Sequence, residues 1–200
     1  YKKEQFLSIQ EAKQVCDWGL ELLNIPKAWK YTDGEGVTVA VLDTGCDLTH
    51  LDLKDNLLEG KNFVDSKKDP IDDSGHGSHV TGIICASNND IGIVGVAPKA
   101  KVRPVKVLDG KGNGSLLNVA KGIRWAIEQK VDFITMSLGS PDPVQEVRKA
   151  IQLAEKNGII TFCAAGNAGP PVCQRFLDPR PPGVRAAPEH GHHGSVQTGG

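Results

Sequence analysis

The 200-residue sequence predicts an α/β fold built on a mostly parallel sheet. Short apolar runs rich in β-branched residues recur along the chain, and such runs are typical of strands buried on both faces. Segments with helical periodicity lie between them, and an alternation of strands and helices favours parallel pairing. The length fits a single domain that buries roughly 70% of the surface its unfolded chain exposes.

Each predicted element follows from its local pattern. Residues 36–42 form a short β-branched run and are predicted to be the first core strand. A polar loop broken by glycines then leads, after residue 75, into a helix of small residues that continues to residue 86. The last predicted helix has Pro143 near its first turn and Asn157-Gly158 after its end, the expected punctuation. The other predictions are strands at 101–108, 131–139 and 158–167 and a helix at 115–130.

Two residues at the predicted strand and helix ends indicate acid–base chemistry. Asp43 follows the first strand directly, and ligands of open α/β sheets bind at the carboxyl ends of strands. His76 lies in the first turn of the next helix, where the dipole disfavours an imidazolium by about 0.3–1 kcal/mol. A hydrogen bond to an ionised carboxylate is worth about 1.5–3 kcal/mol and outweighs that effect. We therefore expect Asp43 to orient His76 as a base; the alternative is that Asp43 only caps its turn.

Composition argues against several classes of partner. The net charge of −1 gives no electrostatic reason to expect nucleic acid or an anionic membrane. No apolar run approaches the ~18 residues of a membrane span, and the first residues lack the apolar core of a signal peptide. The five cysteines are scattered and form no C-x-x-C pair. Free thiols in a reducing compartment are the simplest account, which predicts a cytoplasmic protein. No oligomeric state is predicted.

Three motifs, taken in order, resemble the subtilisin-like serine proteases (subtilases, peptidase S8-like). They are Val41-Leu42-Asp43-Thr44-Gly45, Gly75-His76-Gly77-Ser78-His79-Val80-Thr81-Gly82 and Ala164-Ala165-Gly166-Asn167. Leu-Asp-Thr-Gly-Cys-Asp at 42–47 is most similar to the intracellular members. The resemblance covers about residues 24–169. It implies a three-layer fold with helices on both faces of the sheet, and endopeptidase activity through an Asp-His-Ser triad.

The resemblance also implies roles for single residues. Asp43 and His76 would be two members of the triad, and Asn167 would donate to the oxyanion of the tetrahedral intermediate. A polypeptide substrate would add as an extra strand to the edge at 112–114. The residues that would line the substrate cleft are Gly112, Asn113, Gly114, Leu116, Ser137, Leu138, Gly139, Ala164, Ala165 and Gly166. The small residues near 165 leave room for a sizeable apolar P1 side chain.

A structural Ca²⁺ is the cofactor that the resemblance implies. Asp52 matches the carboxylate of a tight calcium site in the family, although such an Asp is also common in solvated turns. The other ligands would be the side-chain oxygen of Asn89 and the backbone carbonyls of Ser87, Ile91 and Ile93. Calcium prefers six to eight oxygens of this mixed kind. One further ligand, which the family takes from the start of its chain, has no assigned residue here.

The pattern of the family stops after Asn167. Its nucleophile motif, Gly-Thr-Ser-Met-Ala at the start of a helix, does not occur in the sequence. Residues 170–200 hold half of the prolines and show no helix or strand period, which predicts a tail that is disordered or foreign to the fold. The predicted organisation is an N-terminal extension at 1–20, a partial catalytic domain at 21–169, incomplete at its C-terminus, and this tail.

Two functions therefore stay open. The first is a subtilisin-class serine endopeptidase, of which this chain, without the serine, is inactive as given. The second is a non-catalytic peptide-binding module that keeps the substrate edges. By the same resemblance, residues 1–18 could block the cleft, as a short N-terminal extension can in intracellular subtilisins, or they could pack elsewhere as a helix.

Overall fold

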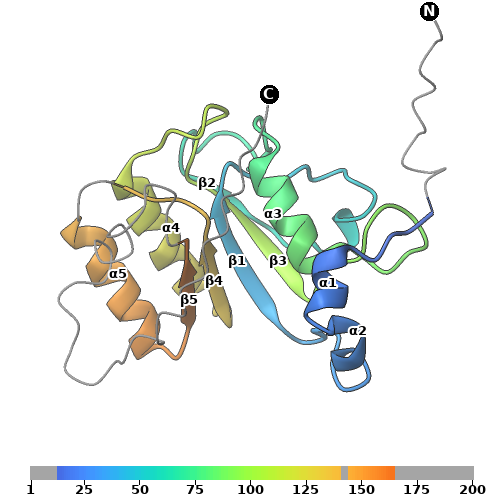
Figure 1. The fold of residues 1–200 in the computed structure, drawn as a ribbon. Helices are drawn as coiled ribbons and strands as arrows, with labels where there is room; N and C mark the ends of the chain where they lie inside the picture. Colours follow the sequence, from blue (N-terminus) through green and yellow to red (C-terminus); the bar gives the residue numbers. More distant parts are fainter. Residues whose placement is uncertain (1–12, 141–143, 165–200) are drawn as a thin grey trace, which may run out of the picture.

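Parallel strands form the centre of the part of the chain that the structure describes. The structure, a computed structural model, describes residues 13–140 and 144–164. Within these ranges five strands run in the order β2-β3-β1-β4-β5, and every neighbouring pair is parallel (Figure 1). The strands are β1 (Thr38–Asp43), β2 (Lys61–Asn62), β3 (Lys101–Lys106), β4 (Phe133–Met136) and β5 (Ile160–Cys163). The helices are α1 (Trp18–Leu22), α2 (Ile25–Ala28), α3 (His76–Cys85), α4 (Leu116–Glu128) and α5 (Gln145–Lys156), with a 3₁₀ helix at Lys54–Asn56.

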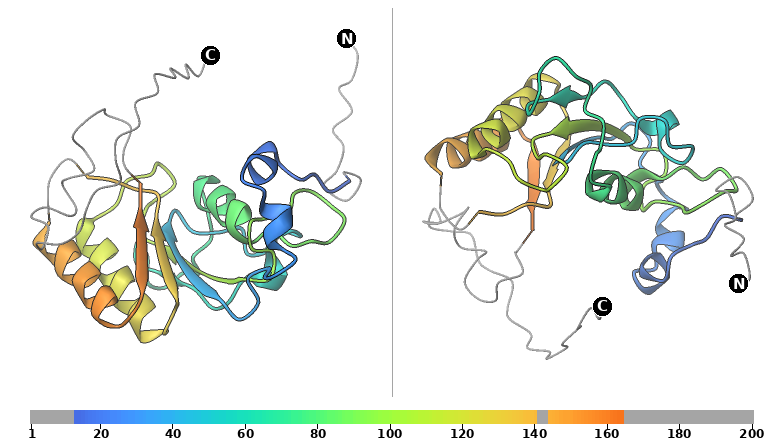
Figure 2. Two further views of the ribbon diagram at one scale, coloured as in Figure 1. Left: turned by 60° about the horizontal axis from the view of Figure 1, so that its bottom comes forward. Right: turned by 90° about the horizontal axis from the view of Figure 1, so that it is seen from above.

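Alternate residues of β1 face two different cores, which makes the fold three-layered. Ala40 and Leu42 pack in a core with residues of α4 and α5. Val39 and Val41 pack on the other face with Cys85 of α3. Figure 2 shows α3 on one side of the sheet and α4 with α5 on the other. The predicted α/β fold, with a parallel sheet covered by helices on both faces, is therefore confirmed.

The boundaries of the strands differ from the predictions. Asp43 is the last residue of β1 rather than the first residue after it. β4 ends at Met136, so that residues 137–139 continue beyond the strand, with Ser137 and Gly139 exposed. β2, with two residues, was not predicted, because so short a segment shows no periodicity. Residues 165–167 of the last predicted strand lie outside the described residues.

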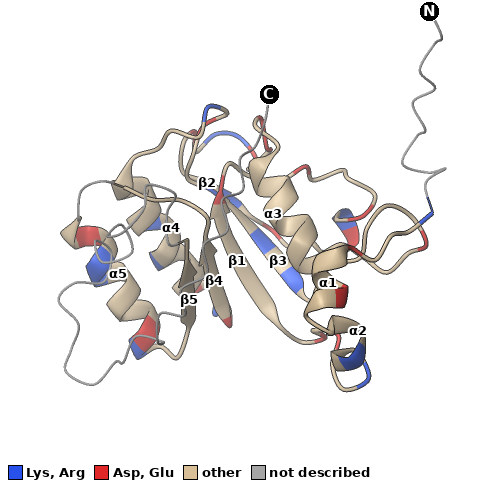
Figure 3. Ribbon diagram, viewed as in Figure 1, with Lys and Arg blue, Asp and Glu red and all other residues tan. Residues whose placement is uncertain are grey.

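Charged residues are unevenly distributed over the sheet (Figure 3). β1 carries no charge before Asp43, whereas the neighbouring β3 carries Lys101, Arg103 and Lys106. Lys106 is only 5% exposed and pairs with Asp43 in the register of the two strands. Its ammonium donates to the Thr44 carbonyl and the Asp73 carboxylate, each at 2.5 Å. A buried cation needs such partners, and this one ties the end of β1 to the loop before α3.

The described end of the predicted N-terminal extension packs on a loop far away in the sequence. Lys13 and Val15 form isolated β-bridges with Ile91 and Ile93, respectively. The helices α1 and α2 follow, and Trp18 of α1 is 74% exposed. No helix in the described ranges combines the length and hydropathy needed to cross a membrane.

Candidate active site

The structure brings Asp43 and His76 into direct contact. Nδ1 of His76 lies 2.7 Å from Oδ1 of Asp43. The Asp43 side chain is fully buried, whereas half of the His76 side chain is exposed. Oδ1 of Asp43 also accepts from the N–H of Thr44 at 2.7 Å, and Oδ2 has no hydrogen-bond partner among the described residues. A buried carboxylate in this position fixes the ring and favours a proton on Nδ1.

A close approach of two backbone segments allows this contact. α3 begins at His76 directly beside the end of β1, and a Cβ at Gly77 would collide with the carbonyl of Gly45. The N–H of Gly77 donates to Oγ1 of Thr44 at 3.0 Å. Only glycine fits at position 77, so the Gly-His-Gly pattern has a steric cause. We call the region of residues 43–47 and 72–78 the β1–α3 junction.

Asp72 holds the β1–α3 junction together, and the sequence reasoning missed it. Its Oδ1 accepts from Oγ1 of Thr44 at 2.8 Å and from the N–H groups of Ser74 and Gly75, each at 2.9 Å. Its Oδ2 accepts from the N–H and the hydroxyl of Ser78, at 2.8 and 2.6 Å. Asp72 therefore caps α3 and links it to the residue after Asp43. An acidic residue just before a helix is a known start signal, which could have marked it.

The electrostatics of Asp72 follow from these contacts. Burial alone would raise the pKa of its carboxyl. The hydrogen bonds from Ser78, Ser74 and Gly75 outweigh burial and hold the pKa well below its ordinary value. Asp72 is thus a permanent anion at neutral pH, and its five hydrogen bonds persist there.

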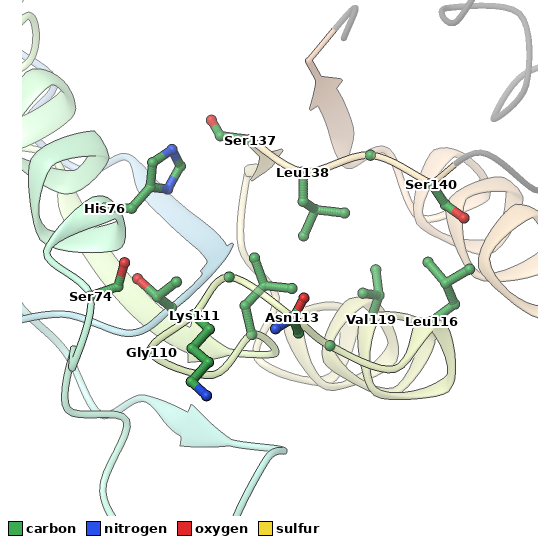
Figure 4. A pocket seen from close by; sticks show the side chains of 15 residues that line it. Ser74, His76, Gly110, Lys111, Asn113, Leu116, Val119, Ser137, Leu138 and Ser140 are labelled. Atoms are coloured by element: carbon green, nitrogen blue, oxygen red, sulfur yellow. The ribbon is translucent and has the colours of Figure 1, made fainter. Parts of the chain in front are cut away.

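A groove of about 560 Å³ begins at His76 and runs between two exposed segments. One side is the loop at 110–114, and the other is the segment at 137–140 that follows β4 (Figure 4). Leu138 on one side faces Leu116 and Val119 of α4 on the other, which makes the far part of the groove apolar. The structure therefore gathers seven of the predicted substrate residues around one groove. They are Gly112, Asn113, Gly114, Leu116, Ser137, Leu138 and Gly139.

The remaining predicted site residues are not placed in this groove. Ala164 is exposed, and its N–H donates to the carbonyl of Met136 at 3.1 Å. Ala165, Gly166 and Asn167 lie outside the described residues, so their roles stay predictions. Nε2 of His76 makes no hydrogen bond within the ranges 13–140 and 144–164.

The residues predicted to bind calcium come together at a second place, which we call the acceptor loop (residues 87–93 with Asp52). Nε2 of Gln14 lies 2.8 Å from the carbonyl oxygen of Ser87 and 3.3 Å from those of Ile91 and Ile93. It also lies 3.5 Å from Oδ1 of Asn89. The side-chain amide of Gln14 thus lies among four acceptor oxygens. The sequence analysis did not identify Gln14 as a site residue.

Asp52 completes the acceptor loop. It is 3% exposed, and its Oδ2 accepts from the N–H of Ile93 at 3.1 Å. Its Oδ1 is buried and has no hydrogen-bond partner in the described part of the chain. A buried carboxylate oxygen without a donor is costly, and this one belongs to a loop in which four other oxygens converge on a single amide.

Fold and site together define a class of protein: an α/β scaffold that sets a buried Asp beside a half-exposed His at the carboxyl edge of its sheet, at the head of an open groove. Comparison with known proteins is more specific. Residues 34–194 match the model of the subtilase family, Peptidase_S8. The chain belongs to this family. The match runs into the region beyond residue 170, which the structure does not describe.

Several relatives resemble the chain over most of its length. It is 46% identical over 172 residues to the major intracellular serine protease of Bacillus subtilis (strain 168), which covers 83% of this chain and 53% of that protein. It is 48% identical over 167 residues to the intracellular serine protease of Paenibacillus polymyxa, covering 80% and 51%. A thermostable alkaline protease of Halalkalibacterium halodurans is 44% identical over 157 residues, covering 78% and 43%. The chain spans about half the length of the curated relatives it matches.

Proposed function

We propose that this chain supplies the acid–base pair and most of the substrate groove of a serine endopeptidase. The observation that carries the proposal is the 2.7 Å contact between the buried carboxylate of Asp43 and Nδ1 of His76, at the head of the groove. A structural role alone does not require a half-exposed histidine to contact a fully buried carboxylate. The names of the relatives, which are serine proteases, support the same reaction class.

The chemistry follows from the hydrogen bonds of His76. Asp43 accepts a hydrogen bond from Nδ1–H, which leaves the lone pair on Nε2 free to take a proton from a serine hydroxyl. The serine then attacks the carbonyl carbon of the substrate, and the imidazolium is stabilised by Asp43, by about 1.5–3 kcal/mol. The same proton next passes from Nε2 to the leaving amine. Water repeats the sequence on the acyl-enzyme. Asn167 is predicted to donate to the oxyanion.

The proposed substrate is an extended polypeptide. The two sides of the groove are exposed backbone segments, Gly112–Gly114 and Ser137–Gly139, and an extended peptide placed between them would pair with one or both as an added strand. Main-chain hydrogen bonds would supply affinity for many sequences. Leu116, Val119 and Leu138 would select an apolar side chain at the far end of the groove.

A structural Ca²⁺ at the acceptor loop is the second component of the proposal. The donor set fits this ion, because Ca²⁺ takes carboxylate, amide and carbonyl oxygens together. Support comes from the unpartnered Oδ1 of Asp52 and from three carbonyls that converge on the amide of Gln14. A half-turn of that amide would replace Nε2 with Oε1. Gln14 is then our candidate for the ligand that had no assigned residue.

We place the protein in a reducing compartment, the cytoplasm. Cys16, Cys46 and Cys85 form no disulfide bond with any described residue. Thiols that stay reduced are typical of such compartments. The relatives named as intracellular proteases agree with this location.

The proposed function is tested with the 200-residue chain itself. It is incubated with a fluorogenic peptide of apolar sequence and, separately, with a phosphonate that labels active-site serines. We expect peptide binding that His76→Ala leaves intact, without turnover or labelling, because the family's nucleophile motif is absent from this sequence. Hydrolysis with covalent labelling would show a serine within these residues and would correct that expectation.

The alternative function is distinguished in the same experiment by adding a small alcohol as acyl acceptor. A competent Asp43–His76 pair should accelerate acyl transfer from a bound activated peptide ester to a small alcohol, and Asp43→Ala should abolish the acceleration. Binding with no such acceleration would favour a non-catalytic peptide-binding module. A chain that binds no peptide would contradict both functions.

A further inference from the structure

The loop at 110–114, which forms one side of the groove, is closed by Asp109, the residue that precedes it. Oδ1 of Asp109 accepts from the N–H of Lys111 and from the N–H of Asn113, each at 2.9 Å. These hydrogen bonds, the one from Asn113 first, hold the pKa of Asp109 below its ordinary value. One carboxylate oxygen therefore bridges two backbone positions of the loop.

Backbone hydrogen bonds complete this closure. The N–H of Asp109 donates to the carbonyl of Asn113 at 2.8 Å, and the N–H of Gly112 donates to the carbonyl of Asp109 at 2.9 Å. Both backbone polar groups of Asn113 are thus used inside the loop. The carbonyl of Gly112 and the N–H of Gly114 make no hydrogen bond to any described residue. These two groups are the ones left for an added strand.

The loop is also supported from behind. A Cβ at Gly110 would lie 2.9 Å from Cγ and 2.9 Å from the backbone oxygen of Asp73, so the two residues are packed without space between them. Asp73 is held in turn by the buried ammonium of Lys106. The groove edge therefore rests on an ion pair that also contacts Thr44, the residue after Asp43.

We propose that Asp109 is a positioning residue for substrate: its carboxylate holds the Gly112–Gly114 edge in the shape that an extended peptide requires before the peptide arrives. The inference rests on the proposed function, because it takes the groove as the peptide site. An edge that is already ordered loses less conformational entropy on binding, which raises affinity without any new contact. Asp109 itself is not among the residues that line the groove.

The role belongs to the acceptor oxygen and not to the negative charge. Asparagine presents a carbonyl oxygen at the place of Oδ1 and can accept the same two hydrogen bonds. Alanine presents none, and the N–H groups of Lys111 and Asn113 then turn to water. The charges that face Asp109 are those of Lys111 and Lys106, and both substitutions remove their attraction equally.

The test uses the full chain and measures two quantities separately: the protection of the loop amides and the affinity for a peptide. Amide hydrogen exchange of Lys111 and Asn113 is followed by NMR, and the affinity for a fluorescein-labelled Leu-Ala-Ala-Phe amide is followed by fluorescence polarisation. In Asp109→Ala we expect exchange of both amides to accelerate at least about tenfold and Kd to rise about three- to tenfold. In Asp109→Asn we expect Kd within about twofold of the parent. Asp65→Ala is the matched control, because Asp65 also accepts from a backbone N–H, that of Lys67, but does not line the groove.

Each other outcome overturns the inference in a recognisable way. Equal weakening in Asp109→Ala and Asp109→Asn would assign the effect to charge. Faster exchange with unchanged Kd would show that the peptide does not use the edge. Protected amides in a parent chain that binds no peptide would show that the proposed function fails although the loop is closed. Asp109→Gly, checked for folding by circular dichroism, must show the same faster exchange and the same rise in Kd as Asp109→Ala.

Discussion

Two regions of the molecule balance hydrogen-bond donors and acceptors in opposite ways. At the β1–α3 junction, the carboxylate of Asp72 receives five hydrogen bonds, and Thr44 both donates to it and accepts from Gly77. At the acceptor loop, four oxygens share the amide of Gln14, and Oδ1 of Asp52 has no donor among the described residues.

The two regions therefore differ in how far each can hold its own geometry. At the junction, Oδ2 of Asp43 has no partner among the described residues. The carboxylate of Asp72 is nevertheless fully engaged there and fixes the backbone around the Asp43–His76 contact. At the acceptor loop, four oxygens converge on one amide and the buried Oδ1 of Asp52 has no donor among the described residues; a cation would satisfy such groups. In the proposed Ca²⁺ site, the ion would help to seat the N-terminal segment on the acceptor loop.

The largest expected effect is at the junction. Asp72→Ala removes the acceptor for five donors, and we expect it to lower the free energy of unfolding by about 3 kcal/mol. The exposed N–H groups of Ser74 and Gly75 recover their bonds from water, whereas the hydroxyl of the buried Thr44 does not. Urea unfolding followed by circular dichroism measures the change. Asp65→Ala should leave the midpoint unchanged. An equal midpoint for both variants would contradict the role given to Asp72.

A slightly smaller effect is expected from calcium at the acceptor loop. At a concentration of Ca²⁺ one hundred times Kd, the free energy of unfolding should rise by about 2.7 kcal/mol. Gln14→Ala and Asp52→Ala should each reduce this rise, whereas Asp72→Ala should respond to Ca²⁺ as the parent does. Thermal unfolding with CaCl₂, MgCl₂ or EGTA measures the response. An equal gain with Mg²⁺ would argue against a site shaped for the larger ion.

Acid should weaken the junction. The folded-state pKa of Asp72 is lowered, so its ionised form stabilises the fold at any pH above its unfolded value of about 3.9, and this contribution is lost as the pH falls from there toward the folded value. Stability should therefore decline steeply below about pH 4. In Asp72→Asn the decline should be shallower. If stability fell with pH in the same way in both chains, the role given to Asp72 would be contradicted.

The last prediction concerns the chemical reactivity of two buried thiols and not the stability of the fold. Burial raises the pKa of Cys46, at the junction, to about 11, and that of Cys85 to about 12. Both thiols therefore stay protonated at pH 8, while Cys16, beside the N-terminal segment, is partly exposed. Iodoacetamide should label Cys16 at least about a hundredfold faster than Cys46. Mass spectrometry of the digested chain gives the rates, and comparable labelling would show that the junction opens.

Much of the fold could be predicted because it depends on local pattern. The β-branched run of β1 and the periodicity of α4 are visible without any contact. The approach of Asp43 to His76 could also be anticipated, since one ends a strand and the other begins the next helix. The strand β2 could not be predicted, because two residues show no periodicity and the pairing of β2 with β3 is a long-range contact.

The supporting residues of the site were harder to find for a physical reason. Gln14 reaches acceptors 73 to 79 positions away, and no spacing in the sequence marks such a contact. Asp109 uses only backbone partners, whose positions depend on the loop conformation. Asp72 differs, because its place before a helix is a local signal that the sequence does carry.

The most direct test of the account is the proton between Asp43 and His76. In a ¹H NMR spectrum of the folded chain, the Nδ1–H of His76 should give a resonance well downfield of ordinary imidazole N–H signals, because it is held in a 2.7 Å hydrogen bond to a buried carboxylate. The resonance should vanish in Asp43→Ala and persist in Asp109→Ala. A folded parent chain without this resonance, or one that keeps it in Asp43→Ala, would contradict the central claim.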